Sequence, residues 1–140
     1  MSSETTRTDT SHLPLPDQDT EEFWKAASEH RLIARRDGGD GVYHYPRHRV
    51  PGTLEPSPGW AELTGRGTVY SFTVVHQAAS RAFRDRVPYV VALIDLDEGP
   101  RLMTNLDADP DEVRIGQRVR VTWRSEEDVT LPVFEPEPEA

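Results

Sequence analysis

The strict alternation of apolar and polar residues in the second half of the chain constrains the fold more than any other feature. In "RVRVTWRS", residues 118–125, Val119, Val121 and Trp123 share one parity, whereas arginine and threonine occupy the other. A period of two is typical of a β-strand that buries one face. The same alternation runs through "GTVYSFTVVHQ" from Thr68 onward. Both segments therefore predict strands.

Three further segments extend this set of strands. "VPYVVALIDLDEG" is strongly apolar, "DEGP" predicts a tight turn into "RLMTNLD", and "TLPVFEP" is a last short strand. About five strands in some 75 residues are enough for a small closed or nearly closed barrel. Gly65 and Gly67 lie where a strongly bent first strand needs space. We expect the barrel core to include Val69 or Tyr70, together with Val91, Leu93, Leu102, Val119, Val121 and Trp123.

A short helix is predicted ahead of the barrel, over residues 19–30. Asp19 is placed to cap it, with Glu22 three residues later as in a capping box. Phe23 and Trp24 fall on its apolar side. Because so short a helix needs a packing partner, two alternatives stay open: the helix covers the domain's own core, or it docks on another protein.

Charge and composition exclude several classes of protein. The formal net charge of −9 argues against bulk attraction to nucleic acid or to an anionic membrane. The absence of cysteine excludes disulfides, thiol nucleophiles and thiolate metal sites. The chain has no apolar run of the roughly 20 residues that span a bilayer, and its N-terminus lacks the pattern of a secretory signal. We expect a cytoplasmic protein that does not enter a membrane.

Arginines concentrate in the middle of the chain. Arg81, Arg84 and Arg86 surround Phe83 in the loop between the first two strong strands. Guanidinium groups bind phosphates in a bidentate manner, so this loop is a candidate for contact with a CoA phosphate, a nucleotide or a nucleic-acid backbone. A solvated loop is the alternative.

Four segments in order carry a resemblance to a known family: "GRGTVYSFTVVH", "PYVVALIDLDEGPRLMTNL", "IGQRVRV" and "LPVFEP". They resemble the OB-fold family that has an N-terminal rubredoxin-like zinc ribbon, and the resemblance covers roughly residues 19–136. It implies a mainly β protein in which a lead helix and a ribbon precede a five-stranded OB-fold barrel. The expected divisions are a disordered tail at 1–18, the helix at 19–30, the ribbon-like segment at 31–59, the barrel at 60–134 and an acidic tail at 135–140.

The ribbon segment departs from the family in its metal ligands. The family's two Cys-x-x-Cys pairs fall at about Arg36 and Gly39, and at about Val50 and Thr53, none of which binds zinc as a thiolate. We therefore expect a degenerate ribbon hairpin without metal, and no zinc. The side chains that could form a replacement site are His44, His48, Asp37 and Asp40.

No convincing catalytic set is present in the sequence. Asp95 and Asp97 alternate with Ile94 and Leu96, which predicts a solvent-facing pair rather than an acid–base pair. His76 stands alone at the end of a strand. We expect no catalytic residue.

Function is implied by the resemblance. Members of the family are typically non-catalytic subunits bound to thiolase-type acyl-CoA enzymes of lipid metabolism: thiolases, lipid-transfer-type aldolases or acyltransferases. The resemblance implies a hetero-oligomer in which this chain braces its partner and shares CoA as a ligand. For the partner contact, the expected residues are Phe23, Trp24, Tyr43, Tyr45 and Arg47; for CoA phosphate, they are Arg81, Arg84 and Arg86. The alternative is single-stranded nucleic-acid binding, with Tyr70, Phe72 and Tyr89 as stacking residues.

Overall fold

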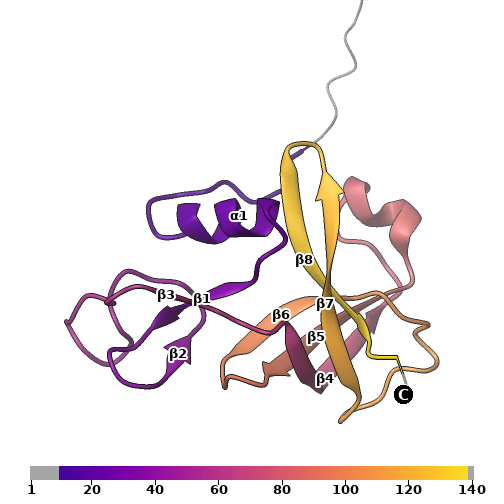
Figure 1. Ribbon diagram of the computed structural model, residues 1–140. Helices are drawn as coiled ribbons and strands as arrows, with labels where there is room; N and C mark the ends of the chain where they lie inside the picture. The colour runs from indigo at the N-terminus through magenta and orange to yellow at the C-terminus, as the bar shows by residue number, and fades with distance from the viewer. Residues whose placement is uncertain (1–9, 139–140) are drawn as a thin grey trace, which may run out of the picture.

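The computed structural model describes residues 10–138 and contains two β units, a small sheet and a barrel (Figure 1). Helix α1 (Glu21–Ser28) lies beside the barrel, on the same side as the small sheet. The expected mainly β fold with a short helix and a closed five-stranded barrel is confirmed. No helix within these residues is long and apolar enough to cross a membrane.

The barrel closes in the strand order β4-β5-β6-β8-β7. Its strands are β4 (Arg66–Val75), β5 (Tyr89–Leu96), β6 (Arg101–Leu106), β7 (Arg118–Glu126) and β8 (Val129–Pro136), and the 3₁₀ helix η1 (Arg81–Arg86) connects β4 to β5. Neighbouring strands pair antiparallel except at β6 and β8, which are parallel and meet at the single pair Leu106–Phe134. This arrangement is consistent with an OB-fold.

The core of the barrel uses the opposite parity of β5 from the one expected. Val90, Ala92, Ile94 and Leu96 are buried, whereas Val91 and Leu93 lie half-buried on the outer face. The prediction that the latter two are core residues is wrong, because residues 90–94 are apolar on both faces and only the aspartates beyond them reveal the parity. The solvent-facing assignment of Asp95 and Asp97 agrees with the observed parity of the strand.

The other residues predicted for the core differ in how deeply they are buried. Val69, Leu102 and Val119 are buried, whereas Tyr70 is 49% exposed. Val121 and Trp123 are partly buried and pack against the core. Trp123 also stacks on His30, with the ring centroids 5.5 Å apart.

The glycines at the start of β4 allow close contact between strands. A Cβ atom on Gly67 would lie 2.6 Å from the carbonyl oxygen of Asp95, and Gly65 has a φ of +79° beneath Val121. The register of β4 against β5 then shifts between Val69 and Ser71. Such an irregularity bends a strand as barrel closure requires.

The small sheet has the order β2-β1-β3, with β1 (Ile33–Arg36) in the centre. Its edge strands are β2 (Val42–Tyr43) and β3 (Trp60–Glu62). Residues 60–62 were expected to belong to the barrel, but in the structure they pair with β1. We call residues 33–62 the ribbon unit.

The segment before α1 is ordered against the rest of the chain. The carboxylate of Asp17 accepts hydrogen bonds from the backbone N–H groups of Asp19 and Thr20, and Thr20 occupies the N-cap position. The predicted capping box of Asp19 and Glu22 is therefore wrong, since Asp17 closes the turn two residues earlier. Of the tail expected to be disordered, residues 1–9 lie outside the described residues, and residues 10–18 form turns without a helix or strand.

Candidate functional site

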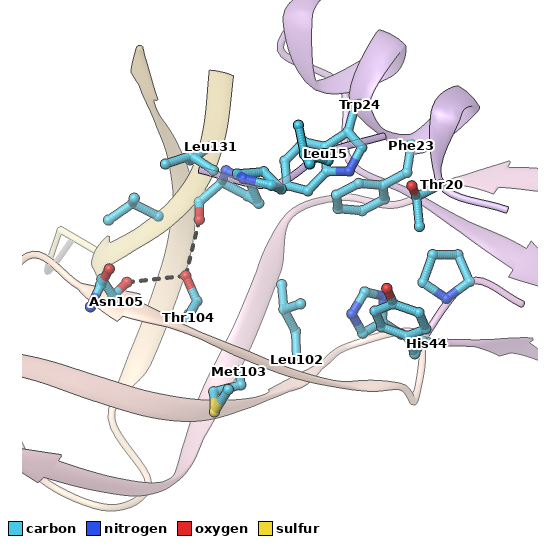
Figure 2. Close-up of a pocket in the computed structure, with 15 residues that line it drawn as sticks. Leu15, Thr20, Phe23, Trp24, His44, Leu102, Met103, Thr104, Asn105 and Leu131 are labelled. Carbon is cyan, nitrogen blue, oxygen red and sulfur yellow. Dashed lines mark hydrogen bonds between the residues drawn. The ribbon is translucent and has the colours of Figure 1, made fainter. Parts of the chain in front are cut away.

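A groove of about 480 Å³ lies where α1, the ribbon unit and the barrel meet (Figure 2). Five parts of the chain form its walls: the segment before α1, the helix itself, the loop after β2, strand β6 and strand β8. The lining residues are Pro14, Leu15, Thr20, Phe23, Trp24, His44, Tyr45, Pro46, Leu102, Met103, Thr104, Asn105, Leu131, Pro132 and Val133. A volume of this size lies within the range of known binding sites.

Aromatic contacts between α1 and the loop after β2 form one end of the groove. The rings of Phe23 and Trp24 meet edge to face at 5.0 Å, and the Phe23 ring lies 5.9 Å from the imidazole of His44. Pro46 is fully buried beside them. Burial lowers the pKa of His44 from its ordinary value of 6.5, because desolvation disfavours the imidazolium. The neutral imidazole thus belongs to the packed wall.

The mouth of the groove exposes apolar side chains. Leu15 is 90% exposed, Met103 69% and Tyr45 56%. The Arg47 guanidinium lies 5.5 Å from the centroid of the Tyr45 ring, and among residues 10–138 no carboxylate forms an ion pair with it. An exposed tyrosine under an arginine is a common arrangement at protein interfaces.

Of the five residues expected to bind a partner, the structure brings three to the groove. These are Phe23, Trp24 and Tyr45, with Arg47 beside Tyr45. Phe23 is only 5% exposed and belongs to the core cluster, so α1 covers the chain's own core, the first of the two alternatives for the helix. Tyr43 has a local role, because its hydroxyl donates a hydrogen bond to the Arg47 carbonyl at 2.5 Å.

The three arginines expected at a CoA phosphate lie on η1, away from the groove. Arg86 forms an ion pair with Glu126 and places its guanidinium 4.9 Å from the Phe83 ring centroid. Arg81 and Arg84 are exposed. The ion pair leaves Arg81 and Arg84 as the more accessible cations of this cluster.

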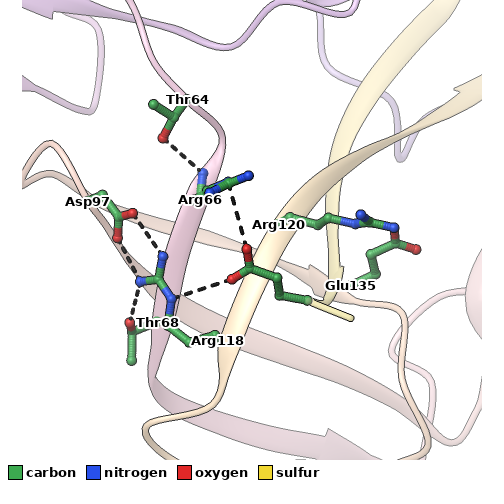
Figure 3. Close-up of polar contacts among 8 residues, drawn as sticks. Thr64, Arg66, Thr68, Asp97, Arg118, Arg120 and Glu135 are labelled. Atoms are coloured by element: carbon green, nitrogen blue, oxygen red, sulfur yellow. Dashed lines mark hydrogen bonds and ion pairs between the residues drawn. The ribbon is translucent and has the colours of Figure 1, made fainter. Parts of the chain in front are cut away.

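The aspartates of the β5–β6 hairpin are occupied by arginines. Arg118 donates two hydrogen bonds to Asp97, at 2.7 and 2.9 Å, and a third to Thr68 (Figure 3). These contacts lower the pKa of the Asp97 carboxyl. Asp95 pairs with Arg101 at 2.7 Å. Carboxylates neutralised in this way are structural ion pairs rather than a general acid and base.

The residues named for nucleic-acid stacking do not form a platform. The Tyr70 ring is covered by the guanidinium of Arg101, 3.4 Å from its centroid. Phe72 packs against the core, and Tyr89 contacts Phe83 on η1. Successive bases need a row of open rings, and these three rings do not provide one.

The four side chains named as replacement zinc ligands do not gather into a site. Within the part of the chain that the structure describes, no group of three or more histidine, aspartate or glutamate side chains could hold a metal. The turns at the former knuckles are closed by backbone hydrogen bonds instead, from Asp37 N–H to the Gly41 carbonyl at 3.0 Å and from Val50 N–H to the Glu55 carbonyl at 2.9 Å.

Comparison with known proteins identifies the family. Residues 60–124 match the family described as "ChsH2, C-terminal OB-fold domain". A "DUF35 domain-containing scaffold protein" of Methanocaldococcus jannaschii is 32% identical over 105 residues, which cover 72% of this chain and 74% of that protein. The chain belongs to the DUF35 family. The resemblance drawn from the four sequence segments is thereby confirmed.

Two further proteins are similar to this chain over most of its length. A chain of known structure described as "Ltp2-ChsH2(DUF35) aldolase" is 36% identical, with a TM-score of 0.77, and the match covers 88% of this chain and 98% of that one. The "3-oxo-4,17-pregnadiene-20-carboxyl-CoA hydratase alpha subunit" of Mycobacterium tuberculosis is 37% identical over 125 residues, 89% of this chain. The match covers only 40% of that subunit, so the chain spans about two fifths of its length.

The residues of the barrel that line the groove were not predicted from the sequence. Met103, Leu131 and Pro132 line it, but they belong to separate strands, and nothing in their local patterns joins them. The apolar residue Met103 on the solvent parity of "RLMTNL" was the one available signal, since that parity is otherwise polar.

Proposed function

We propose that this protein is a non-catalytic accessory subunit that binds and stabilises a thiolase-type acyl-CoA enzyme, most closely one of the lipid-transfer-type aldolases. The observation that carries the proposal is the match to nearly the whole length of the DUF35 chain of an aldolase. The names of the other relatives, a scaffold protein and an alpha subunit, point in the same direction.

The groove supplies the physical support for a docking role. It presents exposed apolar side chains from three separate parts of the chain, Leu15, Tyr45 and Met103. Exposing such side chains together is unfavourable unless another surface covers them. Arg47 at the mouth adds a cation for an acidic group on the partner, although the chain as a whole has a net charge of −9.

The state of the polar residues supports the non-catalytic part of the proposal. Asp95 and Asp97 are engaged by arginines, and the half-buried His44, whose pKa is lowered by desolvation, packs in the wall of the groove. A general acid or base must reach the reacting group of a bound substrate. The enzymatic chemistry therefore belongs to the partner in this proposal.

In this proposal, CoA is a ligand that the chain shares with its partner. Arg81 and Arg84 lie exposed on η1, and Phe83 lies next to them in sequence. We propose that they contact the phosphates of CoA held mainly by the partner enzyme. Ion pairing with Glu126 makes Arg86 a support for this loop.

Co-expression with a thiolase-type enzyme encoded by a neighbouring gene tests the proposal. The expected result is a stable hetero-oligomer in size-exclusion chromatography, with acyl-CoA turnover in the complex and none in this chain alone. Turnover by the isolated chain, lost on the substitution His76→Ala, would contradict the non-catalytic assignment. Failure of the two proteins to associate would contradict the accessory role.

A further inference from the structure

The barrel has an open seam between β6 and β8, and the groove lies along it. The two strands pair only at Leu106 and Phe134. Beyond that pair, the Thr104 hydroxyl donates a hydrogen bond to the Pro132 carbonyl at 3.0 Å, so a side chain replaces the next backbone contact. Past Thr104, no strand of residues 10–138 covers this edge of β6.

The register shows which backbone groups the open edge presents. The Leu96 N–H donates to the Pro100 carbonyl at 2.9 Å, which makes these two residues a hydrogen-bonded pair of the β5–β6 ladder. Hydrogen-bonded and non-hydrogen-bonded pairs alternate along antiparallel strands. Leu102 and Thr104, opposite Ile94 and Ala92, therefore direct their backbone groups toward β5.

Met103 and Asn105 consequently direct their backbone groups to the other side, toward the groove. A bond farther along the strand supports this parity, because the Asp107 N–H, two residues beyond Asn105, donates to the Phe134 carbonyl of β8 at 2.7 Å. The N–H and C=O of Met103 and the N–H of Asn105 thus face a groove with apolar walls. A free strand edge of this kind is a template for another strand.

We propose that the groove receives an extended segment of the partner enzyme, which adds as a strand to the open edge of β6. This inference rests on the proposed function and specifies its contact. The N–H and C=O of Met103 and the N–H of Asn105 are available for hydrogen bonds with the backbone of the added strand, and the apolar walls accept its alternate side chains. At the mouth, the guanidinium of Arg47 lies beside the Tyr45 ring. Its positive charge complements an acidic residue on that segment.

Amide hydrogen exchange measured by NMR tests the inference on the full chain, free and in complex with a co-expressed lipid-transfer-type aldolase. The Met103 and Asn105 amides are expected to exchange rapidly in the free chain and at least about tenfold more slowly in the complex. Leu102, bonded to β5 in both states, is the internal reference. A complex in which Met103 and Asn105 stay unprotected overturns the strand addition and leaves the accessory role intact.

The substitution Met103→Pro removes the N–H that faces the groove and leaves the β5–β6 ladder complete. We expect about tenfold weaker binding of the partner, whereas Met103→Leu, which keeps the N–H, binds as the parent does. Equal weakening by both variants would mean that the side chain matters and the edge does not. If Met103→Pro unfolds the chain, the exchange measurement on the unmodified protein decides.

Two further outcomes separate the inference from its alternatives. Protection of Met103 that rises with the concentration of the free chain would assign the edge to a second copy and overturn the proposal. Failure to form any complex would overturn the accessory role, and the strand addition with it.

Discussion

The imidazole of His44 and the ring of Phe23 lie 5.9 Å apart, which joins the loop of the ribbon unit to helix α1. Ala26 and Ala27 of the same helix are also buried, and Pro46 is buried beside His44. The ribbon unit is therefore held against α1 by packing within the chain.

The substitution Phe23→Ala is expected to lower the free energy of unfolding by about 3–5 kcal/mol, the usual cost of truncating a buried phenylalanine. Phe23 is 5% exposed and lies in the core cluster. Urea denaturation followed by circular dichroism measures the change. Trp24→Ala is the matched control on the same helix turn; because Trp24 is only partly buried, it is expected to cost less. A loss below that of Trp24→Ala would mean that α1 contributes little to the core.

The half-buried His44, which is desolvated by its neighbours, predicts a pH dependence of stability. Its folded-state pKa is below the ordinary 6.5, so below about pH 6.5 the unfolded chain binds the additional proton. The contribution is fully present above this pH and is lost as the pH falls through the lowered value. The free energy of unfolding is therefore expected to fall between about pH 7 and 5, and the substitution His44→Leu to flatten that dependence. An equally steep loss of stability in His44→Leu would show that another group is responsible.

The barrel could be predicted because its strands are marked by patterns among neighbouring residues. Alternation in "RVRVTWRS" and around Thr68 predicts strands from neighbouring residues alone, and the order of four segments matched the family. The buried face of β5 was harder to predict, because residues 90–94 are apolar on both faces of the strand. The pairing of residues 60–62 with β1 depends on a contact across the loop between them, which a local pattern does not reveal.

The candidate site was predictable only in part for the same reason. Aromatic residue type pointed to Phe23, Trp24 and Tyr45, all of which line the groove. The opposite wall is formed by β6 and β8, and its position follows from barrel closure. Arg86 shows the converse case: its residue type suggested phosphate binding, but its partner in the structure is Glu126, 40 residues away.

Purified protein is expected to contain substoichiometric zinc in elemental analysis, and chelators are expected to leave its unfolding midpoint unchanged. The resemblance to the zinc-ribbon family places that family's cysteine pairs at about Arg36 and Gly39 and at about Val50 and Thr53, and this chain has no cysteine. The turns at these positions are closed by backbone hydrogen bonds. Stoichiometric zinc, or a midpoint lowered by chelation, would contradict the prediction, because structural zinc contributes directly to folding.

The double substitution Arg81→Ser with Arg84→Ser is expected to raise the KM of the complex for acyl-CoA by about tenfold, with little change in kcat. Loss of a phosphate contact weakens ground-state and transition-state binding alike. Steady-state kinetics on the assembled complex measures the effect. Arg114→Ser, an exposed arginine outside η1, is the control. An unchanged KM would assign the exposed arginines of η1 to the solvated loop.

The double substitution Tyr45→Ala with Arg47→Ala is expected to weaken association with the thiolase-type partner at least about tenfold, because buried interface anchors cost roughly 2 kcal/mol or more on truncation. Both side chains are exposed in the free chain, so its unfolding midpoint is expected to stay close to that of the parent. Isothermal titration calorimetry measures the affinity. Arg49→Ala, also exposed in the ribbon unit, is the control, with near-parental affinity expected. Parental affinity in the double variant would shift the docking surface to the outer face of the barrel around Tyr70 and Tyr89.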